Sequence, residues 1–254
     1  MTHNITAETI VFNGNDGSAI EGYLALPTDV ERHGSVVVIH HLPGYDEATK
    51  EITRRFATYG YAALMPNLYF RLAPEASADD AAAIARNAGG VSDEQLVGDV
   101  QGAMRLLQAL PTSNGKVGSI GFCSGGRQSF LAGCRLPLDA VIDCYGAFVT
   151  EDATPDFPLA VKGLLDEIPA LRGEVLGLFG AEDMYPSPEQ TNTLSVALSA
   201  AHKRHEFHTF EDAGHAFFNV DRPSYRPEVA VEGWKLVVKF LARTIGEHHV
   251  HLSH

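Results

Sequence analysis

Short runs of apolar residues alternate along the chain with longer segments in which apolar residues recur every three or four positions. Two runs near the start, ETIVFNG and IEGYLALP, flank the turn-rich NDGSA and predict an opening hairpin. Later runs are apolar enough for buried strands: GSVVVIHHL, YAALMPNL, KVGSIGF, AVIDCYG, EVLGLFG and HEFHTF. The pattern therefore predicts about eight strands.

Helices are predicted between these strands. Ile52, Phe56 and Tyr59 recur at spacings of four and three, so they share one face of a helix within residues 46–59. Residues 73–90 permit a helix but define no strong apolar face, as in a cap beside a site. Other helices are expected at residues 93–110, after Gly126, at 194–201, and around Trp234, Val237, Val238 and Leu241.

This alternation predicts the class of fold. Strands that are apolar on both faces and alternate with amphipathic helices specify a mainly parallel sheet covered on each side. We therefore expect one α/β domain over residues 1–246, with helices on both faces, and a histidine-rich tail at 247–254. Ligands collect at the carboxyl ends of parallel strands, so residues that directly follow strands are the first candidates for a site.

The composition is that of a globular protein, with 45% hydrophobic and 20% charged residues among 254. Its 32 acidic residues outnumber 19 lysines and arginines, which argues against nucleic acid or an anionic membrane as a partner. No window approaches the roughly 18 apolar residues that span a bilayer, and the N-terminus lacks a signal-peptide pattern. We expect a cytoplasmic monomer or homodimer that acts on a small molecule.

Three cysteines, Cys123, Cys134 and Cys144, cannot all pair within one chain, and their spacing matches no zinc pattern. We expect reduced thiols, with Cys134 and Cys144 in the core. Among the 12 histidines, His202, His205 and His208 are expected on the surface, and those of residues 247–254 in a solvated tail. No metal site is therefore expected.

Cys123 stands in GFCSG, between Gly121 and Gly125, at the end of an apolar run. This spacing fits a nucleophile elbow, a sharp strand-to-helix turn that exposes a nucleophile and needs small residues two positions on either side. The helix N-terminus would favour a thiolate there. A glycine-rich junction with a buried thiol is the alternative. Ser124 also has a side chain that could act as a nucleophile, but the two glycines are centred on Cys123, so Cys123 is the predicted nucleophile.

The backbone amides beside such a turn can stabilise an oxyanion. The amide of Ser124 would face the developing charge, and a second donor is expected from the loop after the third strand, with Leu42 as the candidate. His40 and His41 lie in the same loop and point to opposite sides. We expect one of them, His41, to face the Cys123 cleft, with a buried structural histidine as the alternative.

A nucleophile elbow needs a carboxylate and then a histidine further along the chain. Asp183 follows the strand EVLGLFG, and His215 lies in DAGHAFF after the last strand. His215 would act as general base and Asp183 would fix its tautomer. For Asp183 the alternative is a cap of the next helix, and Glu182 is its nearest competitor.

These residues resemble the dienelactone hydrolase family, also called carboxymethylenebutenolidases, within the α/β-hydrolase fold. The resemblance runs through most of the chain and rests on SNGKVGSIGFCSGG, YGYAALMPNLYFR, the glycine-containing loop after VVVIHH, GAEDMYPSP and DAGHAFFN, in the family order. It implies a Cys123–His215–Asp183 triad. It also implies hydrolysis of a lactone or small ester through a thioester, without metal or organic cofactor.

Two features of the family do not transfer to this chain. Members place a glutamate near the cysteine where His41 aligns here, and an arginine for the substrate carboxylate where Asn219 stands. Arg71, Arg86 or Arg222 are the possible substitutes, so the expected substrate-binding residues are His41, Arg71 and Asn219. A hydrolase fold that has become a ligand-binding or thiol-sensing protein is the alternative function.

Overall fold

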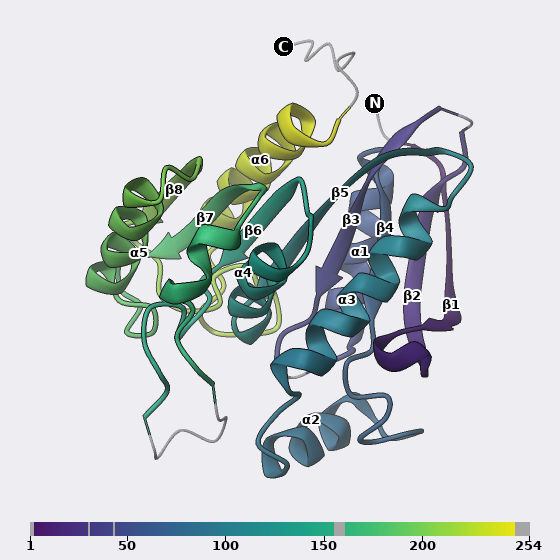
Figure 1. Ribbon diagram of the computed structural model, residues 1–254, viewed down its shortest axis with the longest axis horizontal. Helices are drawn as coiled ribbons and strands as arrows, with labels where there is room; N and C mark the ends of the chain where they lie inside the picture. Colours follow the sequence, from purple (N-terminus) through teal and green to yellow (C-terminus); the bar gives the residue numbers. More distant parts are fainter. Residues whose placement is uncertain (1–2, 30, 43, 155–160, 247–254) are drawn as a thin grey trace.

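The eight strands form one sheet with the order β1-β2-β4-β3-β5-β6-β7-β8 (Figure 1). The structure is a computed structural model that describes residues 3–29, 31–42, 44–154 and 161–246. β1 and β2 form the predicted hairpin, β2 pairs antiparallel with β4, and all later pairs are parallel. The strands are β1 (Ile5–Asn13), β2 (Ala19–Pro27), β3 (His33–Ile39), β4 (Ala62–Pro66), β5 (Ser113–Phe122), β6 (Ala140–Cys144), β7 (Glu174–Gly180) and β8 (His205–Phe210).

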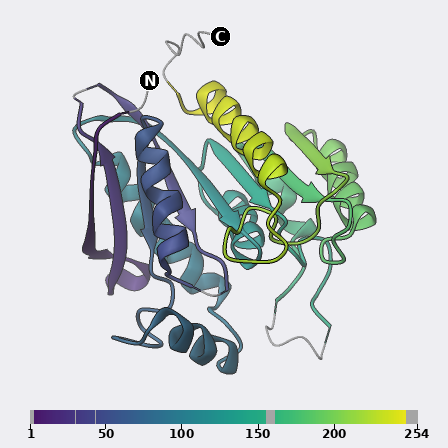
Figure 2. The same cartoon turned by 180° about the vertical axis from the view of Figure 1, so that it is seen from behind.

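Helices cover both faces of this sheet, as predicted. α1 and α6 lie on one face, and α3, α4 and α5 lie on the other (Figures 1 and 2). Within the described residues, no helix is both long enough and apolar enough to cross a membrane. The helices are α1 (Glu47–Thr58), α2 (Ala78–Asn87), α3 (Asp93–Gln108), α4 (Ser124–Arg135), α5 (Pro188–Ala200) and α6 (Pro227–Thr244), with short 3-10 turns η1 (Asn15–Gly17) and η2 (Leu165–Ala170).

Side chains of β3 alternate between two apolar cores. Val36 and Val38 pack in the cluster that contains Trp234 of α6. Val37 and Ile39 pack in the cluster on the side of α3 and α4. All four β3 side chains are buried, because helices cover both faces, and this is why the strand shows a continuous apolar run rather than alternation.

The structure corrects two predicted helix starts. α4 begins at Ser124, three residues before the first position of the helix expected after Gly126. α5 begins at Pro188 rather than near residue 194, because the Ser187 side chain caps its first turn and the Ser187 amide donates a hydrogen bond to the Gln190 side-chain oxygen. The tail at 247–254 lies outside the described residues, so the domain boundary at 246 stays a prediction.

One carboxyl group is buried in the sheet beneath the β5–α4 turn. Asp143 of β6 is 1% exposed; its Oδ1 accepts a 2.8 Å hydrogen bond from the Gly146 amide, and its Oδ2 has no hydrogen-bond partner within the described residues. Burial raises the pKa of Asp143 to about 7, although the Gly146 hydrogen bond opposes the change. The folded protein therefore favours the protonated carboxyl group.

The Asp143→Asn variant tests this burial through the pH dependence of stability. The folded pKa lies above the usual value of 3.8, so the stability that comes from this group is complete below pH 4 and is lost as the pH rises through 7. Urea unfolding at pH 4.5 and 8 should show the unfolding free energy of the wild type falling by about 3 kcal/mol relative to that of Asp143→Asn.

The exposed Asp212→Asn variant provides the control, because it should follow the wild type at both pH values. An equal difference in unfolding free energy between wild type and Asp143→Asn at both pH values would contradict the assignment.

Candidate active site

Cys123 occupies the single residue between β5 and α4. Its backbone has φ 57° and ψ −122°, a region that costs a non-glycine residue conformational energy. Two hydrogen bonds hold it there: its amide donates to Cys144 O at 3.0 Å, and its carbonyl accepts from the Gly126 amide at 2.9 Å. The turn therefore has the backbone conformation expected of a nucleophile elbow.

The flanking glycines allow the backbone to approach itself at this turn. A Cβ atom on Gly121 would overlap the carbonyl oxygen of Gly125, and one on Gly125 would lie 2.5 Å from the carbonyl oxygen of Ile39. Any larger residue at either position would push β5, α4 or β3 apart. The structure thus shows the steric restriction that requires small residues at both glycine positions of GFCSG.

Asp183 and His215 meet at the same edge of the sheet. Asp183 Oδ2 accepts a 2.8 Å hydrogen bond from His215 Nδ1, and its Oδ1 accepts one from the Tyr185 amide at 2.9 Å. The carboxylate side chain is only 4% exposed. The alternative role as a helix cap is wrong, because Ser187 caps α5.

The surroundings of His215 favour its charged form. Burial of the ring opposes the charge, but hydrogen bonds to Asp183 and Cys123, and the negative charges of both, raise the pKa of His215 to about 10. The ring also meets Tyr145 edge-on, with 5.2 Å between centroids. The arrangement can therefore hold an imidazolium between Asp183 and Cys123.

Tyr145 was not predicted as part of the site. It follows β6 directly, has φ 44°, and is 2% exposed. Its position immediately after a buried strand at the carboxyl edge was the available sequence signal.

A cleft of about 430 Å³ opens beside these residues. Its lining brings together all five predicted catalytic and oxyanion residues, and its other walls are mainly apolar. Ser124 is the first residue of α4, where amides have no acceptor inside the helix. The described lining residues are Leu42, Cys123, Ser124, Arg127, Gln128, Ala147, Phe148, Val161, Glu182, Asp183, Met184, Tyr185 and His215.

Arg127 is the only arginine or lysine in that described lining, and its charge is already paired. Its guanidinium donates to both oxygens of Asp93 at 3.0 and 3.2 Å, and to Lys162 O at 2.6 Å. The side chain is only 3% exposed. Arg127 therefore stabilises the wall of the cleft and has no charge left unpaired for a substrate.

The two histidines after β3 have separate environments. His40 Nδ1 donates to His41 O at 2.9 Å, and its Nε2 accepts from the Leu68 amide at 3.2 Å. Burial lowers the pKa of His40 to about 4, so this ring is a neutral structural histidine. His41 pairs with Asp46 at 2.7 Å.

The predicted substrate-binding residues lie away from the described lining of the Cys123 cleft. His41 and Asn219 line a second cavity of about 200 Å³. Arg71 is paired with the fully buried Asp99, with 2.6 Å between Nη2 and Oδ1. Residues 73–90 are expected to form a cap beside the site, but none of them lines the Cys123 cleft. Within the described part of the chain, no group of three or more histidine, cysteine, aspartate or glutamate residues could hold a metal ion.

Known proteins share both this sequence and this fold. A family model described as the dienelactone hydrolase family matches residues 20–245. Proteins named "Putative carboxymethylenebutenolidase" from Methylorubrum extorquens and Yersinia pestis are each 31% identical, covering 85% and 96% of this chain and 74% and 90% of their own length. The crystal structure titled "Putative Dienelactone Hydrolase from Klebsiella pneumoniae subsp. pneumoniae MGH 78578" is 27% identical, with a TM-score of 0.82 over 95% of this chain and 100% of that one. The predicted α/β-hydrolase fold is thereby confirmed, and the protein belongs to the dienelactone hydrolase family.

Proposed function

We propose that the protein is a cysteine-dependent hydrolase of small esters or lactones, with Cys123 as nucleophile, His215 as general base and Asp183 as its orienting carboxylate. The hydrogen bond between Asp183 and His215, in the same cleft as the strained Cys123, carries this proposal. Family membership supports the reaction class.

The thiolate of Cys123 attacks the carbonyl carbon of the substrate, and the carbonyl electrons form an oxyanion. The amides of Ser124 and Leu42 are the proposed oxyanion donors. The C–O bond then breaks, His215 gives its proton to the departing alkoxide, and a thioester remains on Cys123. His215 next takes a proton from water as the water oxygen attacks the thioester. The C–S bond then breaks, which releases the acid and restores the Cys123 thiolate beside protonated His215.

Asp183 acts on this reaction through His215. Its hydrogen bond from Nδ1 leaves the opposite ring nitrogen, Nε2, to exchange the proton with substrate and water. The charge of Asp183 stabilises the imidazolium, and the N-terminus of α4 favours the thiolate.

Cytoplasmic localisation, the oligomeric state and the substrate roles of His41, Arg71 and Asn219 stay predictions.

The first test removes the nucleophile and the base separately. Cys123→Ala and His215→Ala should each lower kcat for a nitrophenyl ester by about 1000-fold or more. The first variant removes the nucleophile, and the second leaves the nucleophile without its base. Turnover is measured by nitrophenolate release, and folding by thermal melting. Cys134→Ala and His208→Ala are the matched controls, since neither residue lines the cleft.

Undiminished turnover in either cleft variant would refute the proposed roles. A single burst of nitrophenol equal to the enzyme concentration, without further release in the wild type, would instead favour a ligand-binding or thiol-sensing protein.

The cleft also predicts which esters are preferred. Its walls include the apolar Leu42, Phe148 and Met184, and its only described lysine or arginine, Arg127, is paired with Asp93. Phe148 stacks on Tyr185 with 5.6 Å between ring centroids. We infer a preference for uncharged, apolar acyl groups over anionic ones, because a substrate carboxylate would lose water without gaining a free cation.

The second test compares two esters of similar length. The kcat/KM for 4-nitrophenyl butyrate should exceed that for 4-nitrophenyl hemisuccinate by about tenfold or more, which corresponds to roughly 1.4 kcal/mol. Glu182→Gln should narrow this ratio by accelerating only the anionic ester, because Glu182 is a negative charge in the lining. Equal or faster hydrolysis of the hemisuccinate by the wild type would contradict the preference.

A further inference from the structure

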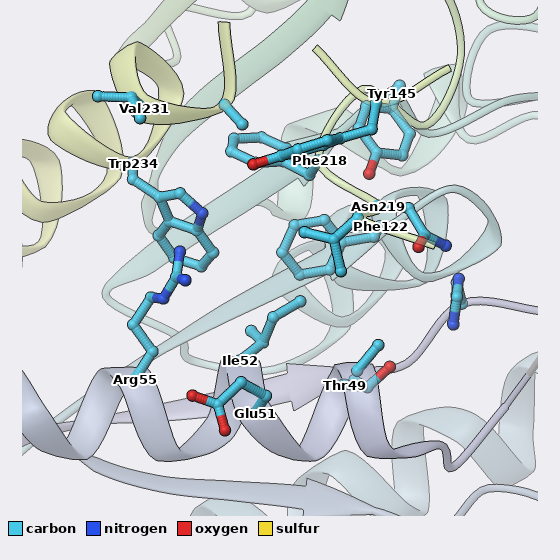
Figure 3. Close-up of a pocket in the computed structure, with 15 residues that line it drawn as sticks. Thr49, Glu51, Ile52, Arg55, Phe122, Tyr145, Phe218, Asn219, Val231 and Trp234 are labelled. Carbon is cyan, nitrogen blue, oxygen red and sulfur yellow. The ribbon is translucent and has the colours of Figure 1, made fainter. Parts of the chain in front are cut away.

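The second cavity lies between α1 and α6 and is bounded by Phe122 (Figure 3). Its volume is about 200 Å³, and the described residues that line it are entirely different from those that line the Cys123 cleft. Two residues of its lining adjoin the catalytic residues: Phe122 precedes Cys123, and the Tyr145 ring contacts His215. The cavity is therefore a separate space beside the site.

Five aromatic residues line the cavity: Phe122, Tyr145, Phe218, Tyr225 and Trp234. In Figure 3 the Phe122, Phe218 and Trp234 rings lie around one space, with Ile52 of α1 below it and Val231 of α6 above Trp234. The Phe218 and Trp234 rings meet edge-on at 5.5 Å, and Phe122 meets Phe218 in the same way at 5.7 Å. Such a wall suits a flat apolar ring, because edge and face contacts are both available.

One guanidinium at this cavity has no carboxylate partner. Arg55 lies over the Trp234 ring at 4.7 Å, and within the described residues it forms no ion pair. The other two cations of α1, Lys50 and Arg54, are paired with glutamates. Glu51, the acidic residue of the lining, is bound to Arg54 at 2.7 Å. Arg55 is thus the free positive charge of this helix, placed at an apolar cavity.

The size of the cavity limits its ligand to one ring. A dry cavity of about 150 Å³ holds benzene, so about 200 Å³ accommodates a benzene ring with a small substituent. An anionic substituent is favoured because a carboxylate accepts two parallel hydrogen bonds from a guanidinium. We propose that this cavity is a second binding site, which takes a small aromatic monocarboxylate with its ring against Phe122, Phe218 and Trp234 and its carboxylate on Arg55.

Trp234 makes the proposal directly measurable. It is the only tryptophan in the chain, and it lies in the cavity wall, so a bound ring should change the intrinsic fluorescence. Benzoate is the probe and benzamide is its uncharged counterpart. Benzoate should give a saturable change with a Kd about tenfold below that of benzamide, because only benzoate can pair with Arg55.

Two variants and one control locate this binding. Arg55→Met should raise the benzoate Kd about tenfold and leave that of benzamide nearly unchanged. Lys239→Met removes the same charge from an exposed position on α6 and should leave both constants unchanged. Ala48→Leu narrows the cavity from α1 and should weaken both probes, so it keeps the test informative if Arg55→Met does not fold.

Alkylation separates the two spaces. Wild-type protein treated with iodoacetamide at Cys123 should still bind benzoate, because the cavity shares no described lining residue with that cleft. Loss of benzoate binding after alkylation, equal benzoate affinity in Arg55→Met, or no saturable fluorescence change would overturn the proposal. Ester turnover does not enter these measurements, so this inference and the proposed function fail separately.

Discussion

The site depends on a backbone constraint, the close contact between the β5–α4 turn and its neighbours. β5 passes into α4 within one residue, and Cys123 takes a φ of 57° to do so. That conformation costs energy, and it persists because the Cys144 carbonyl and the Gly126 amide hold the residue from both sides. Tyr145 and Ala216 also have positive φ values, 44° and 64°. Strained residues thus gather where the carboxyl ends of the strands meet.

This rigid edge creates the electrostatics of the cleft. Asp183 is nearly excluded from water, and both its oxygens accept hydrogen bonds, so neither oxygen is left without a partner. The ring of His215 lies between that carboxylate and Cys123, with Tyr145 against it. A charge that is fixed in a poorly hydrated site acts more strongly than one in water. The raised pKa of His215 follows from this placement.

Sequence patterns predicted much of this arrangement because they report local physics. Apolar runs identified the strands, and the GFCSG spacing identified the turn at Cys123, because only small residues fit there. The partners of His41 and Arg71 could not be predicted from these patterns. Asp46 and Asp99 are two of many carboxylates in an acidic chain, and Asp99 lies 28 residues from Arg71. Side-chain pairing over such distances depends on packing, which periodicity does not encode.

The surroundings of three arginines, Arg127, Arg71 and Arg55, explain which ligand charge each space favours. Arg127 is almost completely buried, and Arg71 is paired with a carboxylate that is fully buried; each forms an ion pair, because an unpaired buried charge is costly. Arg55 is only partly buried, and it rests on the face of Trp234, which compensates part of the lost hydration. It can therefore stay without a carboxylate. The walls of the Cys123 cleft are mainly apolar, and its cations Arg127 and His215 are paired with Asp93 and Asp183. The neighbouring cavity keeps the unpaired charge of Arg55, so the two proposed sites favour ligands of different charge.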